Sequence, residues 1–250
     1  MKQHNKKKNY KNFILSFILI LFIITLLVSS IFIIKWYIDC RENEKIEEQI
    51  SQVVVIENNE KNEEEKEYKI DFDKLKDINE ETVAWLKVNN TNIKYAVVKS
   101  KNNSYYLNHN FEKKYNSGGW IFVDYHNKLD GTDKNIVIYG HNMKDNSMFG
   151  TLKNILKEEW YGNEENYIID FITEEKHYQY QVFSIYKIEK EDYYINTEFK
   201  KNEFEEFIYT LKDRSIKDFN IDVSAEDSIL TLSTCADNNK YRLVLHAKKI

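Results

Sequence analysis

Residues 228–247 read SILTLSTCADNNKYRLVLHA, and this stretch decides the fold. Its first eight residues alternate, which predicts a strand with Thr231, Ser233 and Cys235 on one face. The turn-prone segment ADNNK follows, and then a second strand in which Arg242 alternates with apolar side chains. The pattern predicts a hairpin that brings Cys235 and Arg242 close together near its turn.

A cysteine beside an arginine is a candidate nucleophile. The thiolate is the reactive form of cysteine, and the permanent positive charge of arginine favours it. The alternative for Cys235 is a buried structural cysteine, although a guanidinium is an unusual neighbour for a buried thiol. The chain has only two cysteines, Cys40 and Cys235, which excludes a multi-disulfide scaffold and a four-cysteine zinc site.

A cysteine nucleophile needs a proton-transfer partner, most often histidine. Two of the six histidines, His126 and His141, directly follow predicted strands. His141 ends the segment IVIYGH, which predicts a buried strand that exits at the rim of the fold, where functional sites usually lie. For both residues a solvent-facing turn is the alternative. His246 lies four residues beyond Arg242, roughly 13 Å along a strand, and is therefore too far away.

The rest of the C-terminal part is also rich in strand-forming segments. Strands are predicted at 84–88, 93–98, 120–125, 135–140, 167–173 and 177–188, an amphipathic helix at 202–211, and further helical patterns at 71–83, 104–111 and 148–156. Hydrophobic residues make up 42% of the chain and aromatic residues 14%, enough for a sizeable core. About eight strands with few helices predict a mainly β fold, an eight-stranded closed barrel with peripheral helices.

The N-terminal part has the features of a membrane anchor. Residues 13–34 carry no charge and would span roughly 33 Å as a helix, which matches a bilayer core of about 30 Å. Residues 1–12 hold five lysines and no acid, so the positive-inside rule predicts a cytoplasmic tail and an exterior remainder. A cleaved signal peptide is the alternative, but the apolar run exceeds the usual length and no small-residue cleavage site follows it.

Residues 35–69 are rich in Glu, Asn, Lys and Gln, which predicts an acidic, partly helical stalk before a folded domain at 70–250. The net charge of the chain is −5, although the first 41 residues hold seven Lys or Arg and one Asp. The exterior part is therefore strongly acidic, and an acidic surface is a poor binder of nucleic acid.

Several of these segments together resemble the sortase family. The segment TLSTC that ends at Cys235, with Arg242 seven residues later, resembles the sortase signature, and its Ser233 form is similar to that of class B. The segment IYGHNM around His141 resembles the surroundings of the sortase catalytic histidine, and the helix at 202–211 is similar to an extra class B helix. The segments AWLKV, NSYYL and FVDY extend the resemblance.

Two positions depart from the family pattern. The segment YAVV at 95–98 lacks the proline that commonly follows the tyrosine in relatives, a change that concerns a turn or strand edge. His126 stands where an arginine is common, so no family role is carried over to it.

The resemblance implies a membrane-anchored cysteine transpeptidase whose catalytic domain lies at the cell-wall face. Cys235 would attack the Thr carbonyl of a C-terminal sorting signal and form a thioester, His141 would transfer protons, Arg242 would stabilise the oxyanion, and Ser233 would contact the peptide. The implied partners are secreted proteins with a sorting signal and a peptidoglycan precursor that supplies the acceptor amine. No metal or other cofactor is required.

Two other functions use the same residues differently. A secreted Cys–His wall hydrolase would deliver the acyl group to water, but such enzymes usually place the cysteine early, at a helix N-terminus, whereas Cys235 ends a late strand. A non-enzymatic, membrane-anchored binding ectodomain would make the Cys235→Ala substitution silent.

Overall fold

The computed structural model describes residues 2–58, 66–236 and 240–250. The chain forms two compact units, Met1–Glu42 and Asn43–Ile250. The first unit consists of helix α1 (Lys2–Ser51), whose last turns belong to the second unit. The side chains of residues 13–34 are almost all exposed, and α1 is long and apolar enough to be a candidate membrane span. This helix covers the apolar run that the sequence predicts as the anchor.

The second unit begins within the segment that the sequence suggests to be a stalk. Ile46 and Ile50, one turn apart on α1, are only 4% and 2% exposed. The Asn43 side-chain amide on the same face donates to the carbonyl of Gly119 at 3.3 Å. Beyond the helix, strands β1 (Val54–Asn58) and β2 (Lys66–Ile70) form an antiparallel pair. The end of α1 therefore differs from the predicted solvated stalk, because Ile46 and Ile50 on one helix face pack it against the rest of the second unit.

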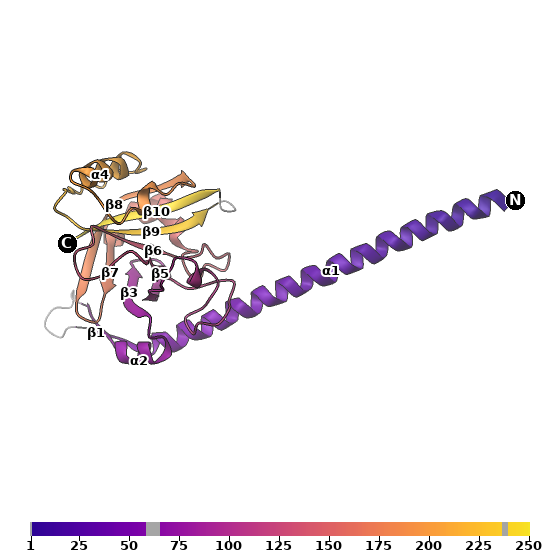
Figure 1. The fold of residues 1–250 in the computed structure, drawn as a ribbon, viewed down its shortest axis with the longest axis horizontal. Helices are drawn as coiled ribbons and strands as arrows, with labels where there is room; N and C mark the ends of the chain where they lie inside the picture. The colour runs from indigo at the N-terminus through magenta and orange to yellow at the C-terminus, as the bar shows by residue number, and fades with distance from the viewer. Residues whose placement is uncertain (1, 59–65, 237–239) are drawn as a thin grey trace. The chain divides into compact units, whose positions relative to one another are not determined.

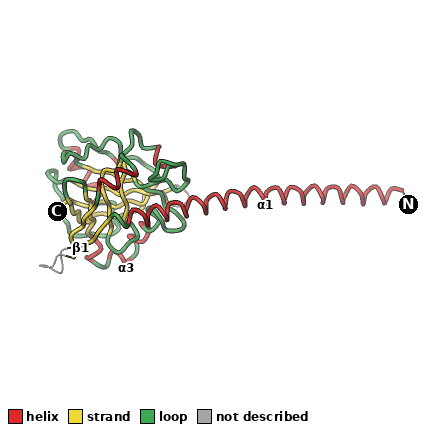
Figure 2. Tube along the Cα trace, turned by 90° about the horizontal axis from the view of Figure 1, so that it is seen from below, coloured by secondary structure: helices red, strands yellow, loops and turns green. Residues whose placement is uncertain are grey.

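Eight strands of the second unit close into a barrel, as the sequence predicts. Its order is β10-β8-β7-β3-β4-β5-β6-β9, with β10 also paired to β9. The strands are β3 (Thr82–Val88), β4 (Lys94–Val98), β5 (Phe122–Val123), β6 (Asn135–Tyr139), β7 (Ile168–Ile172), β8 (His177–Glu189), β9 (Ile229–Ala236) and β10 (Tyr241–Lys249). The pairs β4–β5 and β6–β9 are parallel and the others antiparallel. Figure 2 shows the strands of this unit surrounded by loops and short helices.

The helices of the second unit are short. They are α2 (Phe72–Ile78), η1 (Tyr105–Leu107), η2 (Leu152–Leu156), α3 (Glu158–Tyr161), η3 (Glu164–Tyr167), η4 (Tyr193–Ile195) and α4 (Glu203–Asp213). The structure differs from the sequence-based helices at 71–83, 104–111 and 148–156, which are all longer than the observed ones. Part of the first becomes strand β3, because tertiary pairing overrides local helical spacing.

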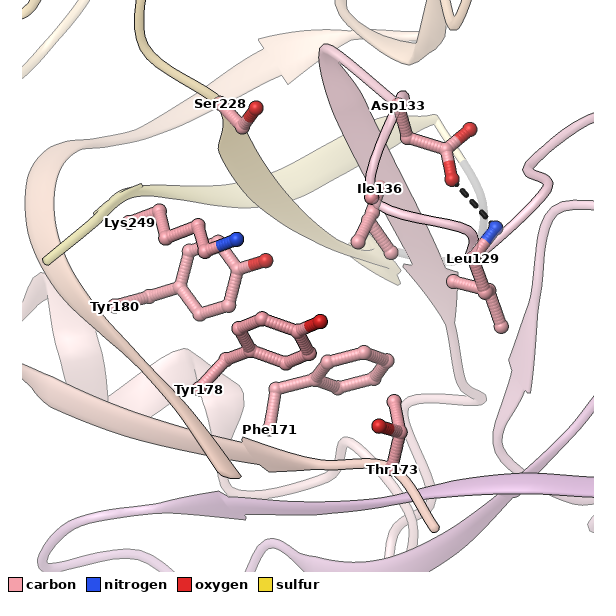
Figure 3. Close-up of a pocket in the computed structure, with 10 residues that line it drawn as sticks. Leu129, Asp133, Ile136, Phe171, Thr173, Tyr178, Tyr180, Ser228 and Lys249 are labelled. Atoms are coloured by element: carbon pink, nitrogen blue, oxygen red, sulfur yellow. Dashed lines mark hydrogen bonds between the residues drawn. The ribbon is translucent and has the colours of Figure 1, made fainter. Parts of the chain in front are cut away.

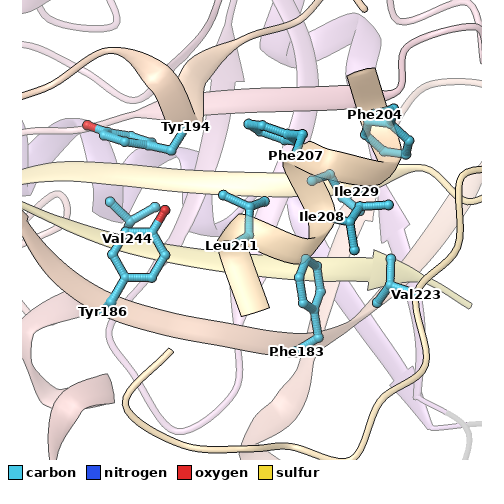
Figure 4. Packing of buried hydrophobic residues seen from close by; sticks show 10 residues of the cluster. All are labelled: Phe183, Tyr186, Tyr194, Phe204, Phe207, Ile208, Leu211, Val223, Ile229 and Val244. Carbon is cyan, nitrogen blue, oxygen red and sulfur yellow. The ribbon is translucent and has the colours of Figure 1, made fainter. Parts of the chain in front are cut away.

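Helix α4 covers the outside of the barrel wall formed by β8, β9 and β10 (Figures 1 and 4). Its apolar face, with Phe207 and Leu211 at the centre, packs against Phe183 of β8 and Val244 of β10. Val244 is two residues from Arg242, so both side chains lie on the same face of β10. Helix α4 therefore covers the same outer face of the barrel on which the side chain of Arg242 lies.

Candidate active site

The hairpin of β9 and β10 places the predicted nucleophile directly opposite the predicted cation. Cys235 and Arg242 are register partners, as are Ser233 and Val244. Directly opposed residues of an antiparallel pair have side chains on the same face, with Cβ atoms about 5 Å apart. Both side chains are half-buried. The Arg242 guanidinium donates to the carbonyl of Tyr241 at 3.1 Å, which holds the charged end of the side chain near the strand.

A second, non-local pairing brings His141 to the same place. Strand β6 runs parallel to β9, with Tyr139 beside Ser233, and the amide of Gly140 donates to the carbonyl of Ser233 at 3.3 Å. The strand ends at Tyr139, and His141 follows in a loop whose next residue, Asn142, donates its side-chain amide to the carbonyl of Cys235 at 2.9 Å. The loop that carries His141 is therefore tied to the end of β9 that carries Cys235.

Gly140 allows β6 to exit the barrel at this point. A Cβ atom at this position would lie 2.4 Å from Cδ1 of Ile121 and 2.8 Å from the ring of Phe149. The hydroxyl of Thr234 donates to the carbonyl of Gly140 at 2.6 Å and ties the exit to strand β9. A larger residue would push β6 away from β9 and would separate His141 from Cys235.

The ring of His141 is oriented by a backbone carbonyl. Its Nε2 atom lies 2.7 Å from the carbonyl oxygen of Leu107, at the end of η1. Because a carbonyl only accepts, Nε2 carries the hydrogen and Nδ1 has the lone pair of the neutral ring. Gly119 supports this segment, since its φ of +56° and its approach to the carbonyl of Tyr106 leave no room for a Cβ atom.

Ser233 is held beneath the site rather than open at its surface. Its side chain is 3% exposed, and its hydroxyl lies 3.0 Å from that of Tyr194 in η4. Burial raises the pKa of Tyr194, so this phenol remains a hydrogen-bond donor at neutral pH. The segment between β8 and α4 is thereby fixed against the nucleophile strand.

The other histidines have different surroundings. Nδ1 of His126 lies 2.8 Å from Oδ1 of Asp124, and the other oxygen of this carboxylate accepts from the hydroxyl of Tyr139. His246 is fully buried and contacts Thr231. This agrees with the sequence-based expectation that His246 is not the proton-transfer partner of Cys235. Neither of the two cysteines, both of which lie in the described residues, forms a disulfide.

Two positions that support the site carry no signal in the sequence. The side-chain amide of Asn142 donates to the carbonyl of Cys235 at 2.9 Å and ties the His141 loop to the end of β9. The carbonyl of Leu107 is a backbone atom, and any residue type could supply it. Both contacts depend on long-range pairing, which residue type and spacing do not encode.

The arrangement joins three chemical groups at one end of β9. Cys235 supplies a sulfur nucleophile, His141 supplies an imidazole with a defined lone pair, and Arg242 supplies a permanent cation with a planar fork of donors. A thiol, a base and an anion-stabilising cation are the groups required for acyl transfer through a thioester.

Comparisons with known proteins agree with this arrangement. A family model described as the sortase domain matches residues 86–250. Sortase B of Staphylococcus aureus (strain NCTC 8325 / PS 47) is 38% identical over 183 residues, which are 72% of this chain and 74% of that protein.

Two solved structures are similar over most of their own length. Sortase B from Bacillus anthracis matches with a TM-score of 0.72 at 34% identity, over 86% of this chain and 99% of that one. A Staphylococcus aureus sortase B–substrate complex matches with a TM-score of 0.67 at 38% identity, over 72% of this chain and 84% of that one. The chain therefore belongs to the sortase family of cysteine transpeptidases, and within that family to class B.

Proposed function

We propose that this transpeptidase cleaves the C-terminal sorting signal of secreted proteins after Thr and joins them to an amine of peptidoglycan. The observation that carries the proposal is the double register around β9. The antiparallel pairing of Cys235 with Arg242 and the parallel pairing of Tyr139 with Ser233, two residues before His141 and Cys235, support this assignment. Three groups from separate parts of the sequence thus meet on one face.

In the first half-reaction the Cys235 thiolate attacks the carbonyl carbon of the Thr residue. A C–S bond forms, the carbonyl oxygen becomes an oxyanion, and Arg242 donates hydrogen bonds to it. The C–N bond then breaks, and His141 in its protonated form gives a proton to the leaving amine. The products are a thioester on Cys235 and the released C-terminal tail.

In the second half-reaction an amine of the peptidoglycan precursor attacks the thioester carbonyl. His141 accepts a proton from this amine, an amide bond forms, and the Cys235 thiolate leaves. Ser233 lies on the same face as Cys235 but is only 3% exposed, so it supports the peptide site from beneath rather than through direct contact. The hydrogen bond to Tyr194 fixes the Ser233 hydroxyl.

The proposed location is the cell membrane, with one span at residues 13–34. The lysine-rich residues 1–12 support a cytoplasmic N-terminus and a catalytic unit at the cell-wall face, by the positive-inside rule. This location supports the proposed reaction because secreted proteins and wall precursors both appear at the outer face of the membrane.

The test is mass spectrometry of the full chain in detergent with a library of fluorogenic sorting peptides. The chain with an unchanged Cys235 should gain the mass of the acyl fragment, and Cys235→Ala should gain nothing while its circular dichroism is unchanged. Cys40→Ala is the matched control and should form the same adduct.

Addition of an amine acceptor separates transpeptidation from hydrolysis. A transpeptidase gives an amide product that contains the amine, whereas a wall hydrolase releases only the free acid. An adduct on Cys40, or full turnover by Cys235→Ala, would reject the proposed mechanism.

A further inference from the structure

The barrel has a pocket at the end opposite the candidate active site (Figure 3). Lys249 lies seven residues from Arg242 along β10, roughly 23 Å at the usual rise of a strand. The enclosed part of the space measures only about 20 Å³ and the rest is open to solvent, so one carboxylate oxygen can enter while the rest of a ligand stays outside. Its walls come from several strands and a loop: Leu129, Asp133, Ile136, Phe171, Tyr178 and Tyr180 line it together with Lys249.

Strand register explains why the polar groups converge there. Lys249 of β10 pairs with Tyr180 of β8, and Tyr178 of β8 pairs with Phe171 of β7. Tyr178 and Tyr180 are two residues apart and share one face of their strand. In Figure 3 the ammonium of Lys249 and the two phenol oxygens point toward the same space, which Ile136 borders on the other side.

These three groups are hydrogen-bond donors without a protein acceptor in the part of the chain that the structure describes. Tyr180 is only 2% exposed, yet no described residue hydrogen-bonds its hydroxyl or that of Tyr178. The ammonium of Lys249 lies 4.1 Å from the centre of the Tyr178 ring and forms no ion pair with a described carboxylate. Neither hydroxyl is enclosed among the described residues, so both reach the open space of the pocket, where they can donate to a ligand.

The charges around the pocket favour an anion with a single negative charge. A second lysine, Lys176, lies over Tyr178 from 5.4 Å, and burial together with this lysine lowers the pKa of Lys249. Asp133 is the carboxylate in the wall, and both of its oxygens accept from the backbone N–H groups of Lys128 and Leu129. A dianion such as phosphate would meet this carboxylate at close range, whereas a monocarboxylate matches one ammonium and two phenols.

We propose that this pocket binds the carboxylate head group of a small or chain-terminal ligand, with Lys249 as the counter-ion and the hydroxyls of Tyr178 and Tyr180 as donors. The apolar rim formed by Leu129, Ile136 and Phe171 contacts the carbon atoms next to the carboxylate. The site is independent of the proposed transpeptidase chemistry, because it shares no residue with Cys235 and its surroundings.

The test uses ligand-observed ¹⁹F NMR on the full chain in detergent micelles. Trifluoroacetate is the probe, and trifluoroacetamide is its neutral counterpart of nearly the same size. Saturable line broadening is expected for the carboxylate, and broadening several-fold weaker for the amide. Unlabelled acetate should reverse the broadening more effectively than inorganic phosphate.

Variants separate the pocket from the many other lysines of the chain. Lys249→Gln should abolish the saturable component, and Tyr180→Phe should weaken it several-fold without lowering the Tm, because the hydroxyl has no described partner to lose. Lys187→Gln is the matched control, since this lysine also lies over a tyrosine ring, 4.5 Å from the centre of Tyr241, and it should bind like the unmodified chain.

Three outcomes would overturn the proposal. They are undiminished saturable binding by Lys249→Gln, equal broadening of the carboxylate and the amide, and stronger competition by phosphate than by acetate. A loss of the Cys235 adduct in the earlier experiment has no bearing on this binding, so the two proposals fail separately.

Discussion

Acidification should destabilise the barrel through His246, the fully buried histidine on β10. The hydroxyl of Thr231 donates to the side-chain oxygen of Asn135 at 2.6 Å, so it must accept from Nδ1–H of His246 at 2.9 Å. Nε2 of His246 then accepts from the hydroxyl of Tyr186 at 2.8 Å. Each partner requires the neutral ring, and a second ring proton would face the hydrogen of Tyr186.

The size of the effect follows from the pKa of His246. Burial, with a smaller effect of Arg214, lowers this pKa from 6.5 to about 3. In the unfolded chain His246 therefore binds a proton near pH 6.5, whereas in the folded chain it does so only near pH 3. The corresponding stability is fully present above pH 6.5 and is lost as the pH falls toward 3. Linkage gives a loss of about 2 kcal/mol between pH 7 and pH 5.

The assay is urea unfolding of the full chain in detergent at several pH values from 7 to 5, followed by tryptophan fluorescence. His246→Gln is the matched variant, because its amide can donate to Thr231 and accept from Tyr186 but does not titrate. The free energy of unfolding of the unmodified chain should fall more steeply with decreasing pH than that of the variant, by about 2 kcal/mol over this range.

Equal pH slopes for the two proteins would refute the reasoning. Such a result would mean that His246 is protonated in the folded state or hydrated in it. The comparison of slopes removes the contribution of the carboxylates and of the other histidines, which are common to both proteins.

Three further predictions concern the site and its supports. Arg242→Lys keeps the charge but loses the planar fork of donors, so turnover should fall roughly 10²–10³-fold, as for Arg242→Ala. Near-normal turnover of the Arg242→Lys variant would leave Arg242 only an electrostatic role. Tyr194→Phe should lower the free energy of unfolding by about 1 kcal/mol through loss of the Ser233 hydrogen bond, and an unchanged urea midpoint would contradict that bond. Ile50→Ala should cost about 2–4 kcal/mol because the side chain is buried, whereas the exposed Gln49→Ala is the control, and equal stabilities would show that the end of α1 is only a tether.

Local pattern was sufficient to predict the strands that carry the chemistry. The alternation around Cys235 and the short turn after it predict a hairpin, and the structure pairs Cys235 with Arg242 as expected. The amphipathic spacing at 202–211 likewise predicts α4, which spans Glu203–Asp213. These features depend on neighbours in sequence, where period and turn chemistry are directly visible.

The placement of His141 depends on a different kind of information. The strand that precedes it, β6, lies parallel to β9 although almost a hundred residues separate them, and no residue pattern states which strands become neighbours. The packing of Ile46 and Ile50 was missed for the same reason, because two apolar residues in an acidic segment are too few to predict a buried face. The family resemblance, rather than periodicity, linked His141 to Cys235.

The position of α4 gives the barrel wall at the active site an unusual degree of support. Strand β9 is paired on one edge with β10 and on the other with β6, and its outer face is covered by the cluster that includes Phe207 and Leu211. A catalytic side chain must be held to within a fraction of an ångström, and packing on all sides achieves this better than a loop does. Ile229 at the start of β9 is fully buried in this cluster, whereas Cys235 near the other end of the strand is half-buried. The outer face of β9 therefore contributes to the hydrophobic core along most of the strand and leaves the nucleophile accessible near its C-terminal end.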